Sequence, residues 1–287
     1  MKTYELLDPE IYFAIGRYCK QKNIRFAGHV PVGVTVEEAS QSGMRSIEHL
    51  TGISKAFSSG EDSLNLVISK EALEIHGFEG PHGMQEVFSH NEDFAIPFDQ
   101  AKAEKVCNVL VANHTAVDPT LSIYRGYYFS RDSLKKLPEM VYVSKEGYDY
   151  WYNISNKSAS EQRYLAREMK NLLFLYQHGV LILAGTDAPN PYVVHGFSLH
   201  NELEWYVDAG LPILAALQTA TINPARFLNK ENEMGTVSKN KFADLVILNS
   251  NPLTDIKNTR DIYAVIANGK HLDRKRLDFL LQHISDY

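Results

Sequence analysis

Short apolar runs alternate with amphipathic stretches along most of this chain, and this alternation restricts the fold more than any other feature. Apolar runs bounded by turn residues are typical of buried strands, and apolar residues at three- and four-residue spacing are typical of helices. Asp8 and Pro9 suit the N-cap and the first turn of a helix, and a strand-like run over 24–29 follows it. The alternation therefore predicts an α/β fold with a parallel sheet.

The same rules predict the remaining elements. Thr35 and Glu38 form a capping-box pattern, and Gly43 is placed to end the short helix that follows. Residues 118–157 are a long, tyrosine-rich polar insertion, which is typical of lids and binding loops. The expected helices are one from Pro9, one between Thr35 and Gly43, and those over 69–76, 99–106, 158–176, 200–208, 212–220, 224–228 and 274–283. The expected strands cover 24–29, 45–50, 109–111, 180–184, 243–248 and 262–267.

The sequence pattern changes near Gly235, where strand-like runs replace the strand and helix alternation. Asn268-Gly269 follows one of these runs and is a strong hairpin signal. We therefore expect a first domain over residues 1–229 and a small β element with a C-terminal helix over 230–287.

Composition excludes several classes of protein. The 29 basic and 35 acidic residues give a net charge of -6, which argues against a nucleic-acid partner. Two cysteines are too few for a disulfide framework, and no apolar run is long enough for a membrane span. The first residues carry acidic side chains and lack a signal-peptide pattern. We expect a cytoplasmic protein, unless a segment upstream once carried such a peptide.

Three polar residues follow predicted strands directly: His29, His49 and Asp187. Because ligand sites of parallel α/β folds lie at the carboxyl ends of strands, we expect these side chains at one mouth. Imidazole nitrogens bind divalent metals, and a carboxylate there needs a cation as partner. A lone histidine at a strand end is more often a hydrogen-bonded structural residue. The neighbouring Glu48 either supports the metal ligands from behind or is a buried charge turned to the neighbouring helix, and we favour the structural role.

The order and spacing of several motifs identify a resemblance that spans nearly the whole chain. The chain resembles the amidohydrolase superfamily, in particular its imidazolonepropionase-like and prolidase-like branch. The matching stretches are Phe26-Ala27-Gly28-His29-Val30-Pro31, Ser46-Ile47-Glu48-His49-Leu50, Ile182-Leu183-Ala184-Gly185-Thr186-Asp187-Ala188, Ala220-Thr221-Ile222-Asn223-Pro224-Ala225, Gly235-Thr236, Ala243-Asp244-Leu245-Val246, Asn251-Pro252-Leu253 and Val265-Ile266-Ala267-Asn268-Gly269-Lys270.

This resemblance implies a partial (β/α)8 TIM-type barrel, strands 4–8, with part of a small β-sandwich at the C-terminal end. It implies that His29, His49 and Asp187 bind a divalent metal, and we expect this metal to be zinc. Relatives hold one or two such ions. Asp187 would also be the general base toward a metal-activated water that hydrolyses a C–N amide bond. Lys2 falls where many relatives carry a carboxylated, metal-bridging lysine.

The chain departs from the family in having no His-x-His motif, which relatives carry on the first barrel strand. We therefore expect a C-terminal portion of an enzyme, with impaired activity. Exposed sheet edges favour pairing with another chain, so we expect a homo-oligomer or a swapped dimer, with no membrane partner. A folded fragment without activity, or a deaminase or lactonase of the same superfamily, remains the alternative.

The other polar candidates are less specific. His114, His195 and His200 lie near predicted strand ends and are candidates for binding a small amide substrate. His76, His82 and His90 are expected in solvated loops. The tyrosines of the insertion are a candidate pocket wall: Tyr124, Tyr127, Tyr128, Tyr148, Tyr150 and Tyr152.

Overall fold

The computed structural model describes residues 1–61, 97–125, 129–154 and 159–284. These form two compact units, Met1–Pro119 with Ala166–Ile182, and Thr120–Leu165 with Leu183–Tyr287. The boundary predicted after residue 229 falls inside the second unit and stays a prediction. The helix expected over 69–76 and the loops with His76, His82 and His90 lie outside the described residues.

The first unit contains a parallel sheet whose strands are neighbours in the order β1-β2-β3-β4. A parallel bridge from Val117 to Ile182 extends this sheet by a fifth segment. Doubly wound sheets reverse their order at a switch point, whereas barrel strands follow one another in sequence, so this order is consistent with part of a barrel. The strands are β1 Lys2–Thr3, β2 Ala27–Gly28, β3 Ser46–Glu48 and β4 Ala116–Asp118.

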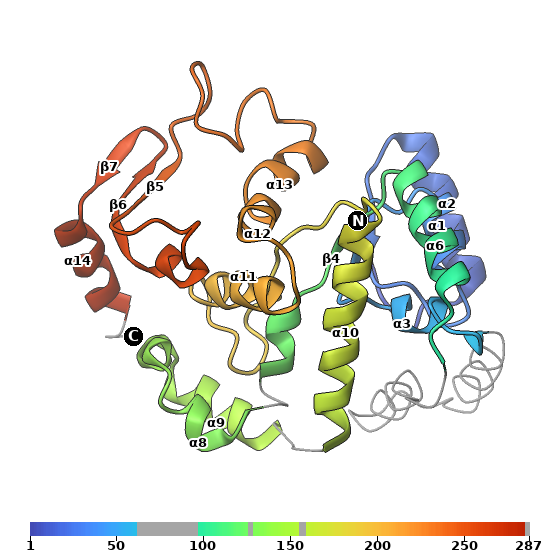
Figure 1. Ribbon diagram of the computed structural model, residues 1–287, viewed down its shortest axis with the longest axis horizontal. Coiled ribbons are helices and arrows are strands. Elements are labelled where there is room, and N and C mark those ends of the chain that lie inside the picture. Colours follow the sequence, from blue (N-terminus) through green and yellow to red (C-terminus); the bar gives the residue numbers. More distant parts are fainter. Residues whose placement is uncertain (62–96, 126–128, 155–158, 285–287) are drawn as a thin grey trace. The chain divides into compact units, whose positions relative to one another are not determined.

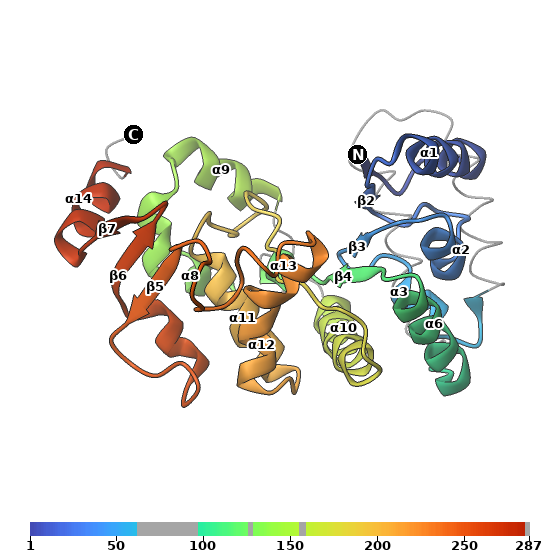
Figure 2. The ribbon, with the colours of Figure 1, turned by 90° about the horizontal axis from the view of Figure 1, so that it is seen from above.

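Helices connect these strands and cover one face of the sheet. Figure 2 shows α1, α2 and α6 on the same side of β2, β3 and β4. Tyr12, Ile47 and Leu110 are fully buried between the two layers. The helices of this unit are α1 Pro9–Lys22, α2 Val36–Gln41, α3 Ile53–Ala56, α6 Gln100–Ala112 and the part of α10 (Ala159–Gln177) from Ala166 onward.

The local signals at the ends of α1 and α2 are confirmed. The Asp8 side chain accepts from the backbone N–H groups of Glu10 and Ile11, and Thr35 and Glu38 form the capping box. Gly43 has a φ of 93°, as expected of a residue that ends a helix.

The strand expected over 109–111 is wrong, because α6 continues through these residues to Ala112. Ala103, Val106, Cys107 and Leu110 are its buried residues, and their spacing is helical. The β-branched Val109 and Val111 favour a strand locally. The segment is nevertheless a helix, because the burial of its apolar side chains at helical spacing outweighs this local preference. The strand itself comes later, at β4.

The second unit is mainly helical, and near its C-terminal end a small antiparallel sheet is followed by a last helix (Figure 1). The described part of the insertion is largely helical rather than an extended loop. The Asn268-Gly269 hairpin is confirmed, with φ angles of 50° and 72° between β6 and β7. The elements are η1 Leu121–Tyr124, α8 Arg131–Leu134, η2 Pro138–Tyr142, α9 Lys145–Ile154, α11 Ser198–Asp208, α12 Ile213–Thr219, α13 Ile222–Phe227, β5 Leu245–Leu248, η3 Ile256–Arg260, β6 Ile262–Ala267, β7 Lys270–Leu272 and α14 Arg274–Ile284.

The buried carboxylate of Glu202 on α11 fixes the start of η1 in this unit. It accepts hydrogen bonds from the backbone N–H groups of Leu121 and Ser122, at 2.7 Å and 2.6 Å. A carboxylate at a helix N-terminus is favoured by the exposed N–H groups there. No helix in the described part of the chain combines the length and hydrophobicity that a bilayer crossing requires.

Candidate metal centre

The strand register brings polar residues to one edge of the parallel sheet. Thr3 pairs with Gly28, Gly28 with Ile47, and Ile47 with Val117. The next residue of each strand therefore lies at the carboxyl edge, where parallel α/β folds place their sites. These next residues are Tyr4, His29, Glu48 and Asp118.

Gly28 allows β1 to approach β2 closely enough to position His29. A Cβ on Gly28 would lie 2.3 Å from the carbonyl oxygen of Thr3, and its φ of 133° favours glycine. The His29 N–H donates to that same carbonyl at 3.0 Å, and the Thr3 hydroxyl donates to the His29 carbonyl at 3.1 Å. The glycine of the Gly-His motif thus fixes the backbone of the candidate ligand.

The imidazoles of His29 and His49 lie beside each other, with ring centroids 4.7 Å apart and planes at 88°. His49 has a φ of 59° and Leu50 a φ of 55°, so the chain turns through the left-handed region directly after β3. Such conformations are uncommon for residues other than glycine and are concentrated at functional sites. The backbone N–H of His49 donates to the carbonyl of Asp118 at 3.0 Å, which holds this turn.

The Thr51 hydroxyl ties the two histidine-bearing strand ends together. It accepts from the Val30 N–H at 3.0 Å and donates to the Glu48 carbonyl at 3.0 Å. Because Val30 follows His29 and Glu48 precedes His49, one side chain couples the backbone positions of both histidines.

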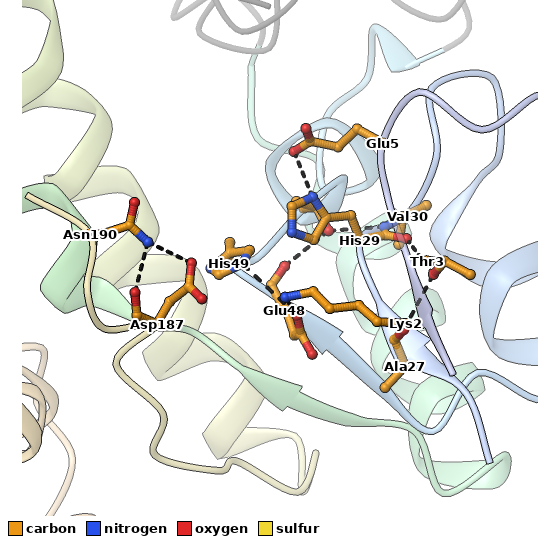
Figure 3. A network of polar contacts seen from close by, with 11 residues as sticks. Lys2, Thr3, Glu5, Ala27, His29, Val30, Glu48, His49, Asp187 and Asn190 are labelled. Carbon is orange, nitrogen blue, oxygen red and sulfur yellow. Dashed lines mark hydrogen bonds and ion pairs between the residues drawn. The ribbon is translucent and has the colours of Figure 1, made fainter. Parts of the chain in front are cut away.

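Glu48 completes a group of three candidate metal ligands. His29, Glu48 and His49 each offer a ligand atom within 4.8 Å of the others, and no other such group occurs within the described ranges. Two nitrogen or oxygen ligands of a tetrahedral zinc ion lie about 3.4 Å apart. The three ligand atoms would therefore have to approach one another by up to about 1.4 Å to share one ion. Figure 3 shows the three side chains at the edge of the sheet.

The surroundings of His29 fit a bound cation. His29 is 8% exposed, and neither ring nitrogen has a hydrogen-bond partner among the residues the structure describes. Buried polar atoms are rarely left without a partner in native proteins. A metal ion bound to this ring would satisfy one of the two nitrogens.

Lys2 reaches the same site from β1. Its Nζ lies 2.7 Å from Glu48 Oε2, and that oxygen lies 4.0 Å from His49 Nε2. The sequence interpretation of Glu48 as structural missed its contact with Lys2 and its place beside the histidines. Its position directly before His49 at the end of a strand was the available signal.

Asp187 belongs to the second unit, and its ligand and base roles stay predictions. It is exposed, has a φ of 54°, and accepts two 2.7 Å hydrogen bonds from the Asn190 side-chain amide, one on Oδ2 and one on its carbonyl (Figure 3). The turn after the apolar run is thus held by a local contact that the sequence did not reveal.

The three histidines expected near strand ends lie in different places. His114 is exposed and precedes β4, at the amino end of that strand, so the structure does not bring it to His29 and His49. Its expected position followed from the misplaced strand over 109–111. His195 is exposed in the second unit, and His200 lies on α11 with Nδ1 3.0 Å from the Thr259 hydroxyl. Burial lowers the pKa of His200, and the charge of Arg260 adds to this effect.

The pocket wall expected from the tyrosines stays a prediction. Tyr148 packs on a buried cluster of Leu134, Trp151, Tyr192 and Val194 in the second unit. Tyr150 is 63% exposed. Tyr127, Tyr128 and the side chain of Tyr152 lie outside the described part of the chain.

Comparisons with known proteins agree on one family and one fold. The model of the amidohydrolase family matches residues 4–272, whereas no curated protein matches the chain. A bottromycin amidohydrolase structure has 21% identity and a TM-score of 0.66, over 99% of this chain and 58% of its own. The structure of an Xaa-Pro dipeptidase with bound methionine has 19% identity and a TM-score of 0.56, over 93% of this chain and 49% of its own. The structure of a putative prolidase from Bifidobacterium longum has 20% identity and a TM-score of 0.56, over 99% of this chain and 59% of its own.

These identities support a shared fold. The chain spans about half the length of these relatives, from 49% to 59%.

Proposed function

Because this chain belongs to the amidohydrolase family, we propose that it is a metal-dependent hydrolase of C–N amide bonds. The observation that carries the proposal is the cluster of His29, Glu48 and His49 at the carboxyl edge of the parallel sheet. The buried Nε2 of His29, which has no hydrogen-bond partner among the described residues, supports a cation at this place.

Zinc is the proposed metal, since nitrogen and carboxylate donors in a small group suit it. His29 and His49 would hold it, with Glu48 as an additional donor. When bound, such a cation polarises an amide carbonyl and lowers the pKa of water toward 7. The chain's own part is to orient both imidazoles, and Thr51 and Gly28 do this through the backbone.

Asp187 is the proposed general base, and a ligand of the same metal. An exposed carboxylate can accept a proton from water and pass it to the leaving nitrogen of an amide. Its contact with the Asn190 amide would orient the carboxylate for this transfer.

Lys2 is the proposed position of a carboxylated, metal-bridging lysine. As an ammonium it forms an ion pair with Glu48. Carboxylation would replace that cation by an anion, so the two side chains would repel each other unless cations lie between them. Bicarbonate-dependent metal uptake that is lost in Lys2→Ala would support this role.

The proposed architecture is part of a (β/α)8 barrel with part of a β-sandwich formed by β5 to β7. The proposed substrates are small amides, such as an N-acyl amino acid or a dipeptide. His195 and His200 remain candidates for substrate binding.

The experiment measures metal content and hydrolysis together. Protein purified in zinc-containing medium is analysed for metal by mass spectrometry, and a panel of N-acyl amino acids and dipeptides is assayed. We expect close to stoichiometric metal, its loss in His29→Ala and His49→Ala with the fold retained, and loss of hydrolysis in Asp187→Asn. Metal below a tenth of an ion per chain would instead favour a folded fragment without activity.

A further inference from the structure

Glu5 contacts His29 on the side of the ring that faces away from the other candidate ligands. Its Oε1 lies 3.2 Å from His29 Nδ1, and the two side chains are 14% and 11% exposed. Figure 3 shows Glu5 at one edge of the imidazole, whereas Glu48 and His49 lie toward the other edge. The proposed hydrolysis has so far given Glu5 no role.

The backbone holds Glu5 at this place. The Glu5 carbonyl accepts from the Val32 N–H at 2.7 Å, and Val32 lies three residues after His29. The segment after β1 and the loop after β2 therefore keep a fixed relation, on either side of the candidate ligand. Glu5 is thus positioned by the same loop that carries His29.

The ring of His29 is held by its neighbours as well. The Tyr4 ring lies 4.7 Å from it at 42°, and the His49 ring 4.7 Å from it at 88°. Packing on both sides limits rotation of the imidazole, so Nδ1 stays toward Glu5. His29 Nδ1 and Glu5 Oε1 are close enough for a hydrogen bond, although the N–H bond does not point at the oxygen. The last side-chain torsion of glutamate is soft enough to align them.

We propose that Glu5 is a positioning residue, which accepts the Nδ1 proton of His29 and leaves Nε2 as the nitrogen that binds metal. A neutral imidazole has one N–H and one lone pair, and an ionised carboxylate can only accept. A proton on Nδ1 therefore frees the lone pair of Nε2. Carboxylates behind metal-bound histidines fix the tautomer and raise the basicity of the ligand. This inference rests on the proposed function.

The experiment compares Glu5→Gln and Glu5→Ala with the wild type, with Glu10→Ala as a control in the exposed first turn of α1. Nitrogen-15 NMR of labelled histidine reports the tautomer of His29 in metal-free protein, and the His29→Ala spectrum assigns its signal. We expect the Nδ1–H tautomer in the wild type and in Glu10→Ala, and its loss in Glu5→Ala.

Zinc titration of the same proteins is the second measurement. We expect Glu5→Ala to bind zinc about 10- to 100-fold more weakly, with Glu5→Gln in between and the circular dichroism spectrum unchanged. An Nε2–H tautomer in the wild type, a tautomer indifferent to Glu5, or unchanged zinc affinity in Glu5→Ala would overturn the inference. A wild type that binds no zinc would overturn the proposed function, whereas the metal-free spectra would still decide whether Glu5 sets the tautomer.

Discussion

Replacing Thr51 by valine tests whether one hydroxyl couples the two histidine-bearing strand ends. Valine has nearly the shape of threonine, so the change removes the hydroxyl and keeps the packing. The hydroxyl makes two hydrogen bonds of 3.0 Å, from the Val30 N–H and to the Glu48 carbonyl. The Glu48 carbonyl keeps a 3.1 Å bond from the Thr51 N–H, whereas Val30, 5% exposed, loses its acceptor.

A buried donor left without a partner costs about 1–3 kcal/mol, and we expect Thr51→Val to lower the free energy of unfolding by this amount. Thr51→Ser is the matched control, because it keeps the hydroxyl and removes one methyl group, worth at most about 0.8 kcal/mol. Urea unfolding followed by circular dichroism measures both variants.

The same pair tests the link to the candidate metal centre. We expect zinc to bind Thr51→Val more weakly than Thr51→Ser, because only valine releases the loops that carry His29 and His49. Equal stability and equal zinc affinity of the two variants would refute the coupling argued from this hydroxyl.

Three further predictions concern packing, pH and assembly. Gly28→Ala should lower the free energy of unfolding by about 2 to 5 kcal/mol, because its Cβ would lie 2.3 Å from the Thr3 carbonyl oxygen. Gly179→Ala is the control for this clash, because Gly179 also has a positive φ, 79°, but no atom lies within 4 Å of the added Cβ; thermal unfolding should show a smaller loss for it. Burial raises the pKa of Glu168, against the opposing effects of Arg167 and the hydrogen bonds from Ser54 and Asn171. The stability that the neutral form contributes is complete below the ordinary glutamate pKa of about 4.3 and is lost as pH rises through the pKa of Glu168 in the folded protein. Glu168→Gln stays neutral at every pH, so urea unfolding should show that it gains stability relative to the wild type from pH 5 to pH 8. The apolar strand β5 lies at the edge of its sheet, and its Val246 is 58% exposed. Because an exposed edge strand can pair with another chain, small-angle scattering should show an oligomer, and a monodisperse monomer would contradict this prediction.

The sequence alone determined the class of fold and the identity of two candidate ligands. Alternation of apolar runs with capped amphipathic stretches predicts a parallel α/β arrangement, because buried strands and packed helices have different periods. The Gly-His and Glu-His motifs at strand ends pointed to His29 and His49, since a strand end can be recognised locally. The capping box at Thr35 and the Asn268-Gly269 turn are local for the same reason.

Only the tertiary structure decided which side chains meet at the site. Lys2 and Glu5 lie in β1 and just after it, whereas their contacts Glu48 and His29 lie in β3 and just after β2. These contacts depend on strand register, which no local pattern encodes. The segment around Val109 shows the same limit, because its β-branched residues favour a strand and only the buried stripe of α6 makes it a helix. The close approach of β1 to Gly28 likewise follows from pairing between distant segments, and that pairing gives the glycine of the Gly-His motif its physical meaning.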